Sequence, residues 1–103
     1  MSRPYNDTFL RKLAEGEITG LGSDLARLCI KAHIPAKYVA VALEVTPLTV
    51  FKWYRGARVQ DQRHAQIEVF MKLVNEDMIV GTLPARNSEA AKIYIQQMLG
   101  REI

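Results

Sequence analysis

A basic and aromatic segment stands out in the middle of the chain, with the sequence VTPLTVFKWYRGARV at residues 45–59. It combines four large apolar side chains with three cations, and a fourth cation, Arg63, follows closely. One explanation is that the large side chains face a core while the cations face an acidic partner. The other is that the whole segment forms a protein-binding surface. The segments around it have to decide between the two.

The positive charge of the chain is concentrated in this region. Residues 1–23 carry three basic and three acidic side chains, whereas residues 24–64 carry seven basic against three acidic ones. Residues 65–103 carry four against five, so the formal net charge of +3 comes from the middle segment. Such asymmetry favours a polyanionic partner, although a solvated basic face has the same composition.

Length and composition limit the function classes. A chain of 103 residues, 49% apolar and 24% charged, is expected to form a single globular domain. Its only cysteine, Cys29, is expected in the core; with two histidines, His33 and His64, it makes a poor metal set, and we expect no metal or cofactor. Without a membrane-length apolar run or a signal peptide, the chain is expected in the cytoplasm.

The pattern of caps and breakers predicts an all-α fold, a compact bundle of five to six short helices. Apolar residues recur at three- and four-residue spacing, and no strand-like alternation is present. Proline is favoured in a first helical turn, and glycine ends helices. The expected helices span about 7–15, 24–33, 35–44, 46–55, 61–80 and 89–99, with Asn6 or Asp7, Ser23, Thr46 and Ser88 as N-caps and Gly56 and Gly100 as stops.

Two of these helices are separated by only Val45 and Thr46. Helices that cross steeply at a tight turn need a small residue where their backbones approach and apolar residues on their inner faces. The small residue is Ala40. The apolar residues are Val39, Leu43, Val45, Val50 and Trp53.

At this point the stretch VAVALEVTPLTVFKW, residues 39–53, resembles the helix-turn-helix of phage repressors, the lambda-repressor and Cro class. The resemblance covers about residues 23–80; residues 1–22, an N-terminal helix with a glycine-rich connector, and residues 81–103, a C-terminal helix, lie outside it. The family usually has glycine at the turn, where this chain has Glu44. A non-glycine residue in a left-handed conformation costs on the order of 1 kcal/mol, and leaves room for a different turn geometry.

The resemblance implies that the helix from Thr46 to Arg55 lies in the major groove of duplex DNA. Its inner face would then be Val50, Trp53 and Tyr54. The residues expected to read bases are Pro47, Leu48, Thr49, Phe51, Lys52 and Arg55. The residues expected to contact phosphates are Lys37, Tyr38, Thr46, Arg58 and Arg63.

These residues favour a sequence-specific transcriptional regulator, with repression by occupancy, acting as a homodimer through the helix at 61–80 and the last helix. The alternative is an adaptor that binds a protein partner through Leu48 and Phe51, one of which could instead pack on a neighbouring helix. An enzyme is not expected. Ser23, Asp24 and His33 fit helix ends better than a catalytic triad, and no strand precedes the glycines at 16, 20 and 22.

Overall fold

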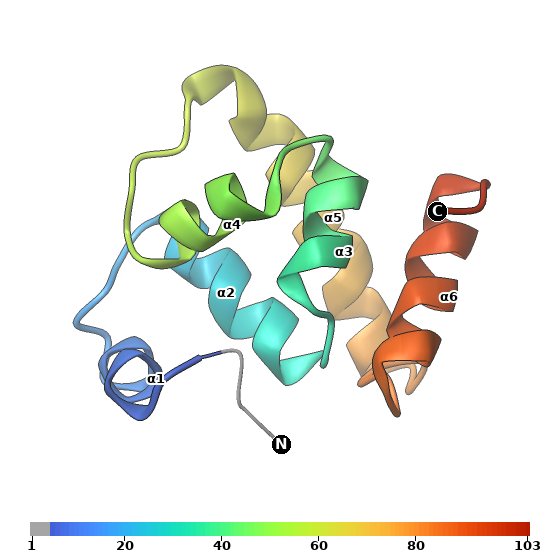
Figure 1. Cartoon of the computed structure of the whole chain (residues 1–103), viewed down its shortest axis with the longest axis horizontal. Coiled ribbons are helices and arrows are strands. Elements are labelled where there is room, and N and C mark those ends of the chain that lie inside the picture. The colour runs from blue at the N-terminus through green and yellow to red at the C-terminus, as the bar shows by residue number, and fades with distance from the viewer. Residues whose placement is uncertain (1–4) are drawn as a thin grey trace.

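The computed structural model describes residues 5–103 and shows six helices and no strand in that range (Figure 1). The predicted all-α bundle is confirmed. The first four residues of the predicted domain lie outside the described residues. The helices are α1 (Asp7–Ala14), α2 (Leu21–Lys31), α3 (Ala36–Leu43), α4 (Pro47–Tyr54), α5 (Asp61–Ile79) and α6 (Ser88–Leu99).

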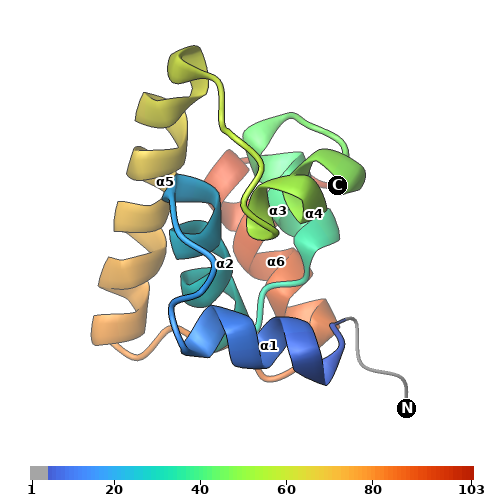
Figure 2. The ribbon, with the colours of Figure 1, turned by 90° about the vertical axis from the view of Figure 1, so that its left-hand side faces the viewer.

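Two helices, α2 and α3, organise the packing. Helix α2 contacts α1, α4 and α5, while α3 contacts α4, α5 and α6. Helix α5 runs along one side of the molecule, α1 crosses one end of α2, and α6 lies beside α3 (Figures 1 and 2). The described chain measures 36 × 34 × 25 Å, with a radius of gyration of 13.0 Å. Helices α2 and α3 therefore both pack against α4.

The core is built from the apolar faces that the spacing predicts. In α5, Ile67, Phe70 and Val74 are buried, and Met71 and Met78 are half-buried against them. Every helix contributes at least two buried side chains, which form one continuous cluster. Burial of these side chains is the main stabilising contribution to the fold. The fully buried larger side chains include Leu25, Cys29, Val39, Leu43, Val50, Tyr54, Ile67, Val74 and Ile95.

Helix ends agree with the sequence at some positions and differ at others. Asn6 accepts a hydrogen bond from the backbone N of Phe9 at 2.7 Å, and Gly56 and Gly100 take positive φ after α4 and at the end of α6, as predicted. The prediction of Ser88 as an N-cap is wrong, because the cap is Asn87, whose side chain accepts from Ala90 at 2.8 Å. The longer amide side chain one residue earlier reaches the same free N–H group.

The predicted start of the second helix is also wrong. Ser23 is not the N-cap but a fully buried residue inside α2, and its hydroxyl donates to the carbonyl of Gly20 at 2.8 Å. The helix begins at Leu21, and Gly22 in its first turn lies against α4. A Cβ atom on Gly22 would stand 2.3 Å from the carbonyl oxygen of Trp53. The glycines at 20 and 22 thus belong to the start of a helix and to a close helix contact.

Side chains outside the region of the resemblance also pack on the core. Phe9 and Leu13 of α1 are buried, and the guanidinium of Arg27 donates to the carbonyl oxygens of Leu13, at 3.0 Å, and Ile18. At the other end, the Tyr94 hydroxyl donates to Asp77 at 2.6 Å and joins α6 to α5. The first and last helices therefore complete the same core that supports α4.

Candidate functional site

The turn between α3 and α4 consists of residues 44–46. Glu44 has φ 59° and ψ 42°, the left-handed conformation, and the backbone N of Val45 donates to the carbonyl of Ala40 at 3.0 Å. The chain thus adopts the glycine-type conformation with glutamate and keeps a strain on the order of 1 kcal/mol. The Thr46 hydroxyl caps α4 by accepting from the backbone N of Thr49 at 3.2 Å.

The inner face of α4 is the one predicted. Val50, Trp53 and Tyr54 are buried, as are Val39, Ala40 and Leu43 on the facing side of the bundle, and Val45 is half-buried. Most of the aromatic bulk in the opening segment is therefore core. This leaves the opposite side of the helix free to carry a binding surface.

The outer face of α4 carries exposed side chains of both kinds. Leu48 is 63% exposed, and Lys52, one helical turn further on, is exposed beside it. Pro47 is exposed and Thr49 is half-buried at the start of the helix. The chain has no acidic residue from Val45 to Gln60, so this face bears positive charge alone.

Phe51 and Arg55 turn toward the N-terminal segment. The half-buried ring of Phe51 lies 6.0 Å from that of Tyr5 and 6.4 Å from that of Tyr54. The guanidinium of Arg55 stands 5.6 Å from the ring centre of Phe9, a cation–π distance. Of the two apolar residues singled out in the sequence, Phe51 packs on its neighbours and Leu48 faces solvent.

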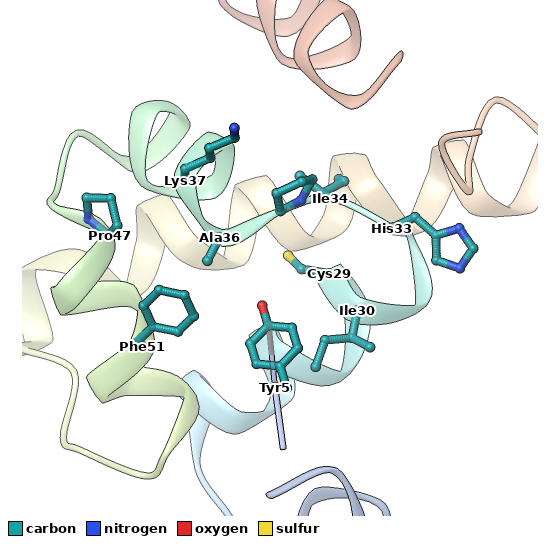
Figure 3. A pocket seen from close by; sticks show the side chains of 10 residues that line it. Tyr5, Cys29, Ile30, His33, Ile34, Ala36, Lys37, Pro47 and Phe51 are labelled. Carbon is teal, nitrogen blue, oxygen red and sulfur yellow. The ribbon is translucent and has the colours of Figure 1, made fainter. Parts of the chain in front are cut away.

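Cations lie on both sides of α4. On one side, the exposed Lys37 borders a hollow together with Pro47 and Phe51 (Figure 3). Its ammonium stands 5.0 Å from the ring centre of Tyr38. On the other side, Arg58 and Arg63 border a second hollow, which Thr46, Thr49 and Glu44 also line. Of the residues predicted to contact phosphates, Lys37, Thr46, Arg58 and Arg63 thus border hollows beside α4, and Tyr38 lies next to Lys37.

The two arginines of this group differ in their freedom. Arg58 forms an ion pair with Asp61 at 3.4 Å, in which both side chains are more than 80% exposed, so the pair is weak. Arg63 is half-buried and donates to the carbonyl of Leu43 at 3.1 Å, which joins the start of α5 to the end of α3. Arg58 is available to a ligand. Arg63 connects α5 to α3, and its remaining guanidinium N–H groups can still donate to a ligand.

Two contributors to the site have no signal in the sequence. Tyr5 supports Phe51, and Gln66 donates to the same Leu43 carbonyl at 3.4 Å. The partners of both are 23 or more residues away in the chain, so local spacing does not reveal them. Burial raises the pKa values of Tyr5 and Cys29 to about 12 and keeps both groups protonated at neutral pH.

The remaining chemistry of the described residues is limited. In the part of the chain that the structure describes, no three His, Cys, Asp or Glu side chains gather as metal ligands would. Within residues 5–103, no helix combines the length and apolar composition needed to cross a bilayer. Comparison of the chain with protein-family models, with curated protein sequences and with solved structures finds no match.

Proposed function

We propose that this protein binds duplex DNA and regulates transcription, with α3 and α4 acting as a helix-turn-helix and α4 lying in the major groove. One observation carries the proposal: the exposed face of Leu48 and Lys52 is flanked by Lys37 on one side and Arg58 on the other. A helix is narrow enough to enter the major groove, and cations on both sides of it meet the phosphates that border the groove.

The placement of the side chains suggests a division of roles. Leu48, Thr49 and Lys52 contact base edges, with Leu48 suited to thymine methyl groups. Lys37, Thr46 and Arg58 bind the phosphates, and Arg63 adds a phosphate contact from the start of α5. Phe51 and Arg55 pack against neighbouring aromatic rings, so they contribute less to base contacts than Leu48, Thr49 and Lys52.

Occupancy of a DNA site is enough to repress transcription, so we propose a phage-type repressor that acts in the cytoplasm on the chromosome. The adaptor alternative loses part of its basis, because Phe51 does not join Leu48 in an exposed apolar patch. Leu48 is the only large apolar side chain of α4 that is mainly exposed to solvent. Single exposed apolar residues are common on proteins that bind no protein partner.

We also propose that the repressor is a homodimer. Val69 and Leu73 of α5 are 59% and 41% exposed, Val80 directly after the helix is 72% exposed, and Ile93 of α6 is 43% exposed. A spacing of four residues places Val69 and Leu73 on the same side of α5. Sedimentation at micromolar concentration should show a dimer that Leu73→Glu converts to a monomer; a monomeric wild-type protein contradicts this.

Selection from a pool of random duplex DNA tests the main proposal. The wild-type chain should enrich one motif, and a Leu48→Ala/Lys52→Ala double variant should lose it while remaining folded, because both side chains are exposed. Lys72→Ala, a variant of an exposed lysine on α5, is the matched control and should enrich the same motif. Absence of enrichment by the wild-type chain would reject sequence-specific binding and favour the adaptor function instead.

A further inference from the structure

A cavity of about 450 Å³ lies beside α4, between the N-terminal segment, the end of α2 and the start of α3 (Figure 3). Its lining comes from four separate segments. The residues that border it are Tyr5, Cys29, Ile30, Ile34, Ala36 and Phe51, with His33, Pro35, Lys37 and Pro47 at the edge. Sites for small molecules in proteins are typically about 300–1,000 Å³ and mainly apolar, so this cavity has the size and lining of one.

Polar groups gather on one side of this apolar cavity. The Tyr5 hydroxyl points toward the Cys29 sulfur, as Figure 3 shows. The Tyr54 hydroxyl belongs to the same cluster, because it interacts electrostatically with both Tyr5 and Cys29. Burial is the largest cause of the raised pKa of all three groups, so each holds its proton.

The cluster lacks a hydrogen-bond acceptor. Tyr54 is 1% exposed and is not part of the cavity lining, and the Cys29 thiol is the group its hydroxyl meets, without the geometry of a good hydrogen bond. The Cys29 thiol next to it is a weak donor and a weak acceptor. The Tyr5 hydroxyl does line the cavity, with this thiol beside it, so a ligand group that accepts a hydrogen bond would pair with it there.

The charged groups at the edge do not face the cavity. In Figure 3 the ammonium of Lys37 and the imidazole of His33 point away from it. The imidazole Nδ1 instead lies 3.2 Å from the carbonyl oxygen of Ala85. A charged ligand would therefore lose its hydration without gaining an ion pair inside.

We propose that this cavity binds an uncharged, mainly apolar molecule of one or two rings that carries a carbonyl group. The rings lie between Ile30, Ala36 and Phe51, and the carbonyl oxygen accepts from the Tyr5 hydroxyl beside Cys29. The inference does not rest on the proposed DNA binding, since the site and its test concern the free protein.

The test is an NMR titration of the whole chain with two probes, 2-acetylnaphthalene and naphthalene. The two share the same rings, and only the first has a carbonyl. Saturable shifts should appear at the amides of Ile30, Ala36 and Phe51, with the ketone binding more tightly than the hydrocarbon. Shifts that do not saturate, or that centre on α5, overturn the site. Equal affinity for the two probes overturns the role of the carbonyl.

Variants distinguish binding in the cavity from nonspecific binding to the protein surface. Ala36→Leu adds volume inside the cavity and should weaken both probes by at least about tenfold. Tyr5→Phe removes only a hydroxyl and should weaken the ketone alone, which keeps the test valid if Ala36→Leu does not fold. Lys72→Ala, at an exposed position on α5, is the control and should change neither affinity. Unchanged binding in a folded Ala36→Leu variant, or in Tyr5→Phe, contradicts the assignment.

Discussion

Both faces of α4 carry large apolar side chains, but only one of the faces is buried. Val50, Trp53 and Tyr54 on the inner face are at most 6% exposed, whereas Leu48 on the outer face is 63% exposed. Hydrophobicity alone does not separate Leu48 from Val50. The position of each around the helix does, because α2 and α3 cover one side only. A short helix can thus hold its place with one face and present a binding surface with the other.

The largest difference between the faces should appear on truncation of side chains. Trp53→Ala is expected to lower the free energy of unfolding by about 3–5 kcal/mol, since it removes a large buried ring. Leu48→Ala, the outer-face control, should change it by less than about 0.5 kcal/mol. Urea unfolding followed by circular dichroism measures both variants. Tryptophan fluorescence does not serve here, because Trp53 is the only tryptophan of the chain and Trp53→Ala removes it. A stable Trp53→Ala variant would mean that the inner face is wrongly assigned.

The backbone contact behind α4 should be the next most sensitive feature. Gly22→Ala places a methyl group 2.3 Å from the Trp53 carbonyl oxygen and should cost about 1–3 kcal/mol, because α2 and α4 must separate. Gly81→Ala is a useful comparison, because its φ of +90° brings backbone strain and no atom lies within 4 Å of the added carbon. It should cost about 1 kcal/mol. Equal losses in thermal unfolding would show that α2 and α4 are not in close contact.

The core that packs against the inner face should also make the fold sensitive to alkali, through Cys29 of α2. Burial raises the pKa of the Cys29 thiol from 9.0 to about 12, so the unfolded chain releases this proton first as pH rises. The stabilisation is fully present below pH 9 and is lost between pH 9 and 12, by about 1 kcal/mol at pH 10. Urea unfolding at pH 8, 9 and 10 measures the loss.

Cys29→Ala is the control for this pH dependence. Without the thiol, the decline should begin nearer pH 10, where Tyr5 ordinarily titrates; in the fold the pKa of Tyr5 is also about 12. The same slope between pH 9 and 10 in both proteins would place the titrating group elsewhere.

The outer face should matter for binding and little for stability. Lys52→Ala is expected to weaken binding to a selected DNA site by about 1 kcal/mol, roughly fivefold, and to change the preferred bases. Lys37→Ala should instead weaken binding to all sequences similarly and lower the salt dependence by about one unit. Fluorescence anisotropy at several salt concentrations distinguishes them, and identical behaviour of the two variants would contradict separate roles.

Much of the fold follows from local sequence. The spacing of Ile67, Phe70 and Val74 identifies the core side of α5, and Thr46 with Pro47 marks the start of α4, because caps and helical periodicity act within a few residues. One of the two cap errors was local, because Asn87 takes the place of Ser88, and the other involves a long-range contact. Ser23 is a cap by residue type, but the helix begins at Leu21, and Gly22 in its first turn lies against Trp53 of α4.

For the candidate site, the sequence by itself determined which residues occupy α4 and which of its faces is apolar. Only the tertiary structure decided how the others are used. Phe51 packs against Tyr5, Arg63 is bound to the carbonyl of Leu43, and Leu48 remains exposed. The physical reason is that exposure depends on which distant segment covers a side chain, and residue type and local spacing carry no record of that segment.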